Sequence, residues 1–591
     1  MAHRSIYKLF EDICQKHGNR TAYQYKRQGI WQSVTWAEQQ ATCKHLAKSL
    51  IALGVQKGQC VSILSQTRLE WVQCDFGIIS SGGVTVGIYP TNLAPDCAYI
   101  INHCEGQIVF VENQEQLKKL FSVRAELAGV RQFILYDGES DAADNVLSWK
   151  DFLQKGEKIT DAEFEARAQN LQPEDLAALV YTSGTTGVPK GVMLTHNNLL
   201  FVSQSASDSL YLRSDFATLL FLPMAHVFAR LIIYFSMRNG IAIAFAESIE
   251  KVAENLKEVR PHFIASVPRI FEKIYTKVIS GVQQAGGVKA KLFHWALNTG
   301  YEVSRLQQQK KSIPAFLNFK HALARKLVLH KISEAFGGRL LWAVSGAAPL
   351  NKSIAEFFHA CGVLILEGLG MTENTSFTNL NRYDHNKFGT VGPVGAGIEM
   401  KLAPDGEILF RGANVMKGYF KNPEATAETI DQEGWLYSGD VGEIDADGFL
   451  RITDRKKDLI ITAGGKNIAP QRIEKILCTS PYISQAVAFG DRQKYVTALI
   501  TLNPDHVTPW AKTQGLQFQN ISELAQHPKV KELIDREVEE KNKELAPFES
   551  VKKIRILPND LSIAGGELTP SLKIKRKMVM EKYRDVLEEM Y

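Results

Sequence analysis

Six consecutive Gly, Ser and Thr residues occupy positions 182–187, and Lys190 follows shortly after them. Glycines allow a backbone to approach an anion closely and to turn its N–H groups toward it. The hydroxyl groups add donors, and the lysine adds a mobile positive charge. The GKS or GKT ending of a Walker loop is absent. The run therefore predicts a phosphate-binding loop of another kind. Its members are Thr182, Ser183, Gly184, Thr185, Thr186, Gly187 and Lys190.

Two other groups are ambiguous on sequence grounds alone. His226 lies in the apolar run 217–237, so it is either a hydrogen-bonded core histidine or a site residue. The basic run at 573–577, which begins with Lys573, is typical of a solvated helix face. No G-x-S-x-G elbow is present, so nothing in the sequence indicates a serine hydrolase.

Short apolar segments separated by helical patterns must position these groups. Four of these segments are continuous apolar runs, which predict parallel strands covered by helices on both faces. They are 60–64, 84–88, 107–111 and 132–136. Runs 177–181 and 191–194 predict strands on either side of the phosphate loop, and Thr195 is suited to cap the next helix. After Gly392 the strands become short, and Asp447-Gly448 predicts a hairpin turn. A smaller unit begins near Arg455.

Composition narrows the class of protein. The 591 residues are 45% hydrophobic and 23% charged, which is typical of globular chains. The net charge of +5 argues against nucleic acid as the main partner. The eight cysteines lack C-x-x-C spacing and are interpreted as reduced thiols. The polar start does not resemble a secretory signal, and Pro223, His226 and Arg230 interrupt the most apolar run. We expect a cytoplasmic protein, attached at most to the cytoplasmic face of a membrane.

Residues 288–339 carry ten basic and two acidic residues, a net charge of +8. Their spacing around 292–296 is helical. Two interpretations remain open: a solvated helical face, or a patch that contacts anionic lipid.

Four motifs, in this order, resemble the adenylate-forming (AMP-dependent) synthetase and ligase superfamily. They are YTSGTTGVPKG from Tyr181, EGLGMTE from Glu367, GWLYSGDVGEIDADGFLRITDRKKDLI from Gly434 and GELTPSLKIKRK from Gly566. Three further segments resemble sequences of the long-chain fatty acid CoA ligase branch. They are FLPMAHVFAR, SVPRIFEKI and the basic insert before VSGAAPL. Leu572 also resembles that branch, because many other members of the superfamily carry glycine at this position.

The resemblance implies an α/β fold in two domains. The larger, 1–453, would combine α/β-layered sheets with a small β-barrel-like subdomain and bind AMP. The smaller α+β domain, 454–591, would be mobile, carry the catalytic lysine and turn about a hinge at Asp454. Gly464-Gly465 would enter the site for thioester formation.

The resemblance also implies a two-step reaction that uses ATP, Mg²⁺ and coenzyme A. A fatty acid carboxylate attacks the α-phosphorus, which gives acyl-AMP and pyrophosphate, and the thiol then displaces AMP. Positioned cations would stabilise the charge that develops on phosphate oxygens.

Specific residues acquire roles by this resemblance. Residues 182–190 would hold the β- and γ-phosphates, Thr372 would contact the α-phosphate, and Glu373, joined by Thr182, would bind Mg²⁺. Asp440 and Arg455 would hold the ribose. The adenine would lie against Gly346, Ala347, Ala348, Glu367, Gly368 and Leu369.

Lys573 would bridge the carboxylate and the α-phosphate during acyl-AMP formation, and His226 would lie beside the acyl chain. Leu369 replaces the aromatic residue usual at the adenine, and Ala229 replaces a glutamate frequent in the long-chain branch. A ligase for medium-chain, aryl or polyketide-like acids, or one that loads a carrier protein, is the first alternative. An inactive nucleotide-binding or membrane-scaffold protein is the second.

Overall fold

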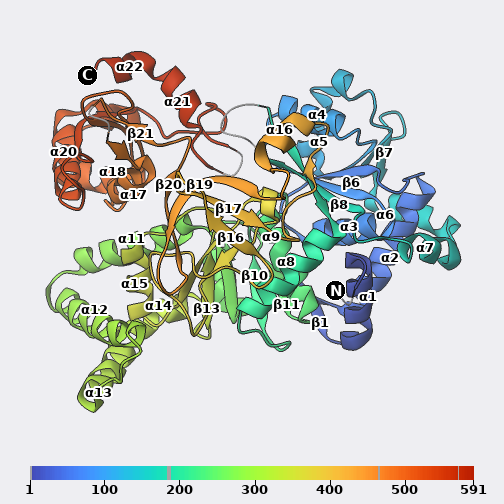
Figure 1. The fold of residues 1–591 in the computed structure, drawn as a ribbon, viewed down its shortest axis with the longest axis horizontal. Coiled ribbons are helices and arrows are strands. Elements are labelled where there is room, and N and C mark those ends of the chain that lie inside the picture. The colour runs from blue at the N-terminus through green and yellow to red at the C-terminus, as the bar shows by residue number, and fades with distance from the viewer. Residues whose placement is uncertain (1–2, 183–187, 464–465, 570–571) are drawn as a thin grey trace.

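The computed structural model describes residues 3–182, 188–463, 466–569 and 572–591. Ser183, Gly184, Thr185, Thr186 and Gly187 of the predicted phosphate loop therefore lie outside the described residues. The same is true of Gly464 and Gly465. A large unit with two eight-stranded sheets fills most of the molecule, and a smaller C-terminal unit packs against it (Figure 1).

The first sheet contains the four apolar segments for which strands were predicted. The inner strands pair in parallel, as expected for strands separated by helices. β8 and β9, on either side of the predicted phosphate loop, pair antiparallel. In spatial order the strands are β18 (Gly418–Tyr419), β9 (Lys190–Thr195), β8 (Leu176–Thr182), β4 (Val84–Ile88), β3 (Cys60–Leu64), β5 (Ile108–Asn113), β6 (Gln132–Asp137) and β7 (Val146–Ser148).

The second sheet is parallel at its centre and antiparallel at both edges. Its strands in spatial order are β15 (Asn379–Leu380), β14 (Ile365–Leu369), β13 (Trp342–Ser345), β12 (Phe263–Ser266), β10 (Ala217–Leu220), β11 (Ala242–Phe245), β1 (Thr21–Arg27) and β2 (Ile30–Thr35).

The main hydrophobic core joins these two sheets through the helices that pack against both. α3 and α9 are buried along almost their whole length. The predicted cap is confirmed, because the Thr195 hydroxyl accepts a hydrogen bond from the Asn198 N–H at the start of α8. The helices of this part are α1 (Ile6–His17), α2 (Trp36–Ala52), α3 (Leu69–Ser80), α4 (Ala94–His103), α5 (Gln114–Phe121), α6 (Trp149–Lys155), α7 (Asp161–Ala168), α8 (His196–Ser209), α9 (Val227–Arg238), α10 (Val252–Val259), α15 (Lys352–Ala360) and α16 (Pro423–Thr429).

The apolar run 217–237 forms β10 and most of α9 and lies in the core, as predicted. Within the described part of the chain, no helix has the length and apolar character needed to cross a bilayer. All eight cysteines are free thiols, as predicted, and seven of them are buried.

A small four-stranded antiparallel sheet follows the second large sheet. Its strands are β16 (Glu399–Leu402), β17 (Glu407–Arg411), β19 (Leu436–Ile444) and β20 (Leu450–Arg455), with β16 and β20 at opposite edges. The predicted hairpin turn joins β19 to β20. The Asp445 carboxylate accepts hydrogen bonds from the N–H groups of Asp447 and Phe449, and Gly448 supplies a φ of +83°.

The C-terminal unit has a core of its own, which begins at Ile460. Its three-stranded sheet combines an antiparallel and a parallel pair. Its elements are β21 (Ile460–Ile461), β22 (Asn467–Ile468), α17 (Pro470–Leu477), β23 (Ile483–Phe489), β24 (Val496–Leu502), α18 (Pro504–Thr513), α19 (Ile521–Gln526), α20 (Pro528–Asn542), β25 (Val551–Ile556), α21 (Arg576–Lys582) and α22 (Arg584–Glu588). Asp454 lies in β20, just before this unit, and the division of the chain at this residue stays a prediction.

The basic segment is helical, and part of it stands away from the body at the lower left of Figure 1. Its helices are α11 (Pro268–Ala285), α12 (Gly287–Gln308), α13 (Ala315–Ala324), a π-helical turn (Arg325–Leu329) and α14 (His330–Ala335).

Candidate active site

The predicted adenine residues come together where two neighbouring strands end. β13 and β14 pair in parallel, with Ser345 opposite Glu367, so residues 346–348, which follow β13, lie beside residues 367–369 at the end of β14. Gly346 and Gly368 fit closely against their neighbours. A Cβ at Gly346 would stand 3.3 Å from the Phe228 ring, and one at Gly368 would stand 2.9 Å from Leu380.

Glu367 is a buried carboxylate at this edge. Its Oε1 accepts a hydrogen bond from the Leu350 N–H at 2.8 Å. Burial raises the pKa of Glu367 to about 7, while the Leu350 bond and the charge of Lys475 oppose the shift. Lys475 was not predicted. It comes from α17 of the C-terminal unit, and no feature of the amphipathic helix that contains it distinguishes this lysine in the sequence.

Thr372 and Glu373 begin a tight turn after β14. The Asn374 side chain accepts a hydrogen bond from the Met371 N–H at 2.8 Å, and Thr375 takes a left-handed φ of +57°. The Glu373 carboxylate accepts a hydrogen bond from the Tyr419 hydroxyl at 2.9 Å. The turn therefore holds its acidic side chain at a fixed position.

Tyr419 is a second residue that sequence reasoning missed. It lies in β18, which pairs with β9, and so stands beside the strand that carries Lys190. The Lys190 ammonium lies 5.0 Å from the centre of the Tyr419 ring. Thr182 and Lys190 pair across the base of the loop. Tyr419 thus contacts both the predicted metal ligand Glu373 and the phosphate-loop lysine. No pattern in the sequence distinguishes this tyrosine from the other aromatic residues of the chain.

Asp440 and Arg455 face one another on the hairpin of the small sheet. They are cross-strand partners in β19 and β20, and the Arg455 Nε donates to the Asp440 carboxylate at 3.2 Å. Burial raises the pKa of Asp440, while the positive charges of Arg455 and Lys573 oppose that shift. The two predicted ribose residues are therefore adjacent.

Lys573 follows a residue with a strained backbone. Leu572 takes a left-handed φ of +62° and is 67% exposed. Thr569 holds the Lys573 backbone, since its N–H donates to the Lys573 carbonyl at 2.8 Å and its hydroxyl accepts from the Lys573 N–H at 3.0 Å.

The Lys573 side chain lies within electrostatic reach of the predicted ribose and metal residues. The side chain remains accessible to solvent. Desolvation by the surrounding protein and the nearby Arg455 lower the pKa of its ammonium, whereas Asp440 and Glu373 act in the opposite direction. These interactions bring a lysine of the C-terminal unit to residues of the large unit.

His226 is the N-cap of α9, and its Nδ1 accepts a hydrogen bond from the Phe228 N–H at 3.1 Å. Burial, followed by the charge of Lys573, lowers its pKa to about 3. The imidazole is therefore neutral near pH 7, and it lies near enough to Lys573 to feel that charge. Its predicted contact with an acyl chain stays a prediction.

Asp454, the predicted hinge, is only 5% exposed. Burial raises its pKa to about 6, and the Arg455 N–H and the Arg576 guanidinium oppose the shift. The structure shows a single arrangement of the two units, so the hinge role stays a prediction.

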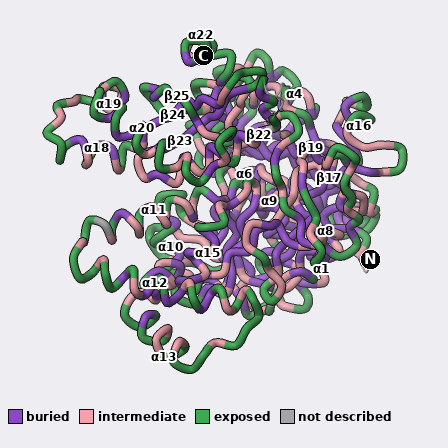
Figure 2. The backbone as a smooth tube through the Cα atoms, turned by 60° about the vertical axis from the view of Figure 1, so that its left-hand side comes forward, coloured by how far each residue is buried: buried purple, intermediate pink, exposed green. Residues whose placement is uncertain are grey.

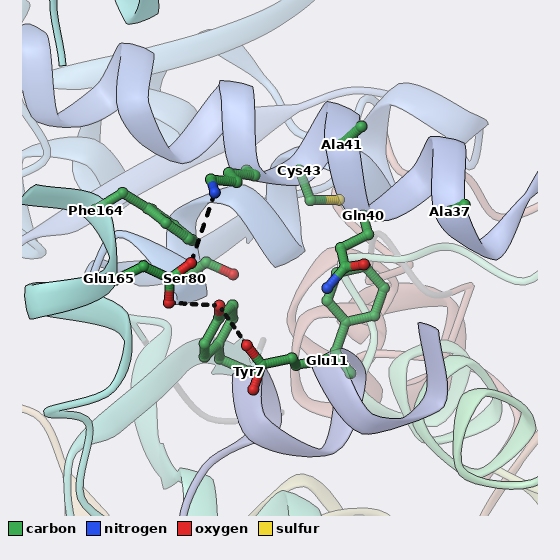
Figure 3. Close-up of a pocket in the computed structure, with 11 residues that line it drawn as sticks. Tyr7, Glu11, Ala37, Gln40, Ala41, Cys43, Ser80, Phe164 and Glu165 are labelled. Atoms are coloured by element: carbon green, nitrogen blue, oxygen red, sulfur yellow. Dashed lines mark hydrogen bonds and ion pairs between the residues drawn. The ribbon is translucent and has the colours of Figure 1, made fainter. Parts of the chain in front are cut away.

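A cavity of about 270 Å³ lies elsewhere, between α1, α2, α3 and α7 (Figure 3). Its polar groups bond mainly to one another. The Tyr7 hydroxyl donates to Glu11 and Glu165, and the Lys44 ammonium pairs with Glu165 at 3.6 Å and with Asp161 at 3.0 Å. None of the predicted site residues that the structure describes lines this cavity.

The described site residues together form a region of alternating charge. Lys190, Arg455 and Lys573 supply positive charge, and Glu373 and Asp440 supply carboxylates. Such a region suits a polyphosphate bound with a divalent cation.

Two family models match the chain in the order of its two units. The model described as AMP-binding enzyme matches residues 10–420, and the model described as AMP-binding enzyme C-terminal domain matches residues 457–591. This chain belongs to the AMP-binding enzyme family.

Curated relatives of this AMP-binding enzyme cover nearly its whole length. The Long-chain-fatty-acid--CoA ligase FadD15 of Mycobacterium bovis is 37% identical over 96% of this chain and 94% of its own length. The Long-chain-fatty-acid--CoA ligase ACSBG2 of Homo sapiens is 32% identical over 99% of this chain and 92% of its own length.

Solved structures share the fold at lower identity. The adenylation domain of a carboxylate reductase from Mycobacterium chelonae superposes with a TM-score of 0.79 at 20% identity, covering 100% of this chain and 92% of that one. The anthranilate CoA ligase AuaEII, in complex with anthranoyl-AMP, superposes with a TM-score of 0.75 at 20% identity. The match covers 100% of this chain and 99% of that one. The two-unit α/β fold expected from the sequence is thereby confirmed.

Proposed function

We propose that this AMP-binding enzyme is a long-chain fatty acid–CoA ligase that activates its acid with ATP. The names of the curated relatives support the substrate class. The observation that carries the proposal is the approach of Lys573 to Asp440, Arg455 and Glu373. A lysine from the C-terminal unit thereby lies beside the residues assigned to the nucleotide.

In the first step a fatty acid carboxylate oxygen forms a bond to the α-phosphorus, and the bond from that phosphorus to the pyrophosphate oxygen breaks. Lys573 would neutralise the oxygens that gather charge at this phosphorus, together with Thr372. Lys190 and the phosphate loop would retain the leaving pyrophosphate. Asp440 would accept hydrogen bonds from the ribose hydroxyls, with Arg455 beside it.

The residues around Glu373 fit Mg²⁺. Its carboxylate and the Thr182 hydroxyl are hard oxygen donors, and Mg²⁺ is usually held by one or two carboxylates together with substrate phosphates. The ion would supply charge neutralisation on those phosphates. Tyr419 would keep the Glu373 carboxylate turned toward the phosphate-loop side of the site.

In the second step the sulfur of coenzyme A bonds to the acyl carbon, the bond from that carbon to the AMP oxygen breaks, and the thiol proton is released. We propose that the C-terminal unit turns about Asp454 between the steps, and the nearness of Lys573 to Asp440 and Glu373 in this arrangement supports its use in the first step.

Product analysis by mass spectrometry tests the activity. The full chain is incubated with ATP, Mg²⁺, coenzyme A and a panel of short, medium, long-chain and aromatic acids. Long-chain acyl-CoA with an equal amount of AMP is the expected product. Acyl-AMP without thioester would indicate a different acceptor, such as a carrier protein. Neither product from any acid would contradict the proposed function.

Lys573→Ala tests the assigned lysine. We expect acyl-AMP formation to fall at least about 100-fold, because one positioned electrostatic group at a transition state typically contributes that much. ATP binding and thermal unfolding should change little. Lys577→Ala is the matched control, since Lys577 belongs to the same basic run and is exposed. Equal activity of the two variants would refute the role of Lys573.

We also propose that the basic segment 288–339 contacts an anionic membrane. This contact would not depend on the catalytic activity of the enzyme.

A further inference from the structure

Two side chains of α4 contact the chain on both sides of the predicted phosphate loop. The His103 Nδ1 lies 2.7 Å from the hydroxyl of Tyr181, the last residue but one of β8. The Tyr99 hydroxyl donates to the carbonyl of Pro189 at 3.2 Å, and Pro189 precedes Lys190 at the start of β9. One helix therefore bonds to the chain just before the loop and again just after it.

Tyr99 and His103 are four residues apart, which places them on the same face of α4. Their rings stack, with centroids 5.4 Å apart and an interplanar angle of 25°. Along α4, buried residues alternate with half-buried and exposed ones, and both rings are half-buried (Figure 2). Neither ring can turn away from the strands without losing the stack. We call these two residues the α4 pair.

The α4 pair also contacts the end of β18. The His103 and Phe420 rings meet edge to face, with centroids 5.7 Å apart. Phe420 follows β18, and its N–H donates to the Gly191 carbonyl of β9 at 2.8 Å. A Cβ at Gly191 would stand 3.2 Å from the Tyr181 ring, so that ring lies directly on the backbone of β9. His103 thus touches a group of residues that ties β8, β9 and β18 together.

The bond between His103 and Tyr181 joins two neutral groups. Burial, followed by the charge of Lys421, lowers the pKa of His103, while Glu105 opposes the shift. Burial raises the pKa of Tyr181, so its hydroxyl keeps its proton. The α4 pair therefore supplies position rather than charge to the strands beside the loop.

We propose that the α4 pair positions the phosphate loop for the β- and γ-phosphates of ATP. Tyr99 and His103 are positioning residues, because they act through the ends of β8 and β9 rather than on the nucleotide. The adenine, the ribose and the α-phosphate are assigned to other elements. Loosening the α4 pair should therefore weaken only the contacts with the two outer phosphates. The inference rests on the proposed function for the assignment of the loop.

Calorimetric titration of the full chain tests the inference with two nucleotides in the presence of Mg²⁺. One is AMP, and the other is the α,β-methylene analogue of ATP, whose carbon bridge prevents the release of pyrophosphate. His103→Leu and Tyr99→Phe should each weaken binding of the analogue about fivefold, because each loses one hydrogen bond, and should leave AMP binding unchanged. Unchanged binding of the analogue, or equal losses for the analogue and AMP, would overturn the proposal.

Two further variants test the hydrogen bond itself. His103→Asn places an amide oxygen near the position of Nδ1 and should restore most of the affinity for the analogue. A double-mutant cycle combines His103→Leu with Tyr181→Phe, and the pair should bind the analogue no more weakly than Tyr181→Phe alone. Additive losses in the double variant, or an asparagine variant as weak as the leucine variant, would contradict the proposal.

Matched controls change similar side chains elsewhere. His45→Leu replaces another half-buried histidine, in α2, and Tyr383→Phe removes a hydroxyl from an exposed ring. Both should bind the two nucleotides as the unaltered chain does, and a control that loses as much affinity for the analogue as His103→Leu would overturn the proposal.

The titrations contain neither fatty acid nor coenzyme A, so they are independent of the product analysis. A chain with the expected binding differences that made no acyl-CoA would contradict the proposed function and leave the role of the α4 pair intact. A chain that made acyl-CoA, with variants that bound the analogue normally, would do the reverse.

Discussion

At the scale of single residues, the hydroxyl of Tyr419 holds the carboxylate of Glu373. This hydroxyl donates a hydrogen bond to the Glu373 carboxylate, and the Lys190 ammonium lies over the ring of the same tyrosine. We predict that Tyr419→Phe raises the Mg²⁺ concentration needed for half-maximal acyl-AMP formation several-fold. The reason is that the carboxylate loses its fixed orientation while the ring and its packing remain.

Calorimetric titration of ATP in the presence of Mn²⁺ checks the same prediction without turnover. The variant should bind the metal–nucleotide complex more weakly and should unfold at nearly the same temperature, since one hydrogen bond contributes about 1 kcal/mol. Tyr383→Phe is the control, because that ring is 46% exposed. Unchanged metal dependence would show that Tyr419 does not position Glu373.

His226 gives a prediction about acid stability. The unfolded chain protonates this histidine near its ordinary pKa of 6.5, whereas the folded protein does so only at about 3. More protons are then bound by the unfolded state, so the free energy of unfolding falls as the pH falls through this window. His226→Asn keeps a side chain suited to the N-cap and removes the titration. Denaturation curves at several pH values should show a weaker acid dependence in the variant.

At the scale of elements, a buried group of three side chains fixes α9 to α3. The Arg230 Nη2 donates to Asp75 at 2.7 Å, the Tyr234 hydroxyl donates to the other Asp75 oxygen at 2.7 Å, and Arg230 and Asp75 are each 1% exposed. Because His226 caps the first turn of α9, this contact helps to fix the position of that histidine.

Asp75→Asn should therefore destabilise the protein by about 3–5 kcal/mol, because it leaves the Arg230 charge buried without a counter-charge. Tyr234→Phe removes two hydrogen bonds, one donated to Asp75 and one accepted from Arg230, and should cost about 2 kcal/mol. Chemical denaturation measures both. Equally small losses of stability in the two variants would mean that solvent reaches Arg230. The Arg230–Asp75 pair would then not hold α9 in place.

The elements also show what the sequence can predict. The strands at 60–64, 84–88 and 132–136, the Thr195 cap and the turn at Asp447-Gly448 follow from local patterns, and the structure confirms them. The contacts of Tyr419 and Lys475 with the site arise from strand pairing and unit packing between residues distant in sequence. The charge of 288–339 was visible in the sequence, but which of its apolar residues would be exposed was not.

At the scale of the whole molecule, Lys475 contributes to the arrangement of the two units. Its ammonium interacts with Glu367 and with Glu272 of α11, both in the large unit, although burial lowers its pKa. In this arrangement Lys475 supplies positive charge to two largely buried carboxylates. An arrangement that moves α17 away would lose that interaction.

We predict that Lys475→Gln slows acyl-AMP formation about tenfold, equivalent to about 1.4 kcal/mol, by lowering the population of this arrangement. Thioester formation from supplied acyl-AMP should not slow, because that step is proposed to use another arrangement. Single-turnover measurements of each step, with Lys494→Gln as control, decide the question. Equal slowing of both steps would contradict this role.

Leu572 has a consequence for how the enzyme tolerates substitution. A left-handed conformation costs most residues about 1–2 kcal/mol, and β-branched side chains are accommodated there least well. Leu572→Val should therefore slow acyl-AMP formation about tenfold while every side chain assigned to the chemistry is retained, whereas Leu572→Gly should be tolerated. A genetic screen for variants of reduced activity would then recover substitutions at this exposed leucine, although its side chain takes no part in the chemistry.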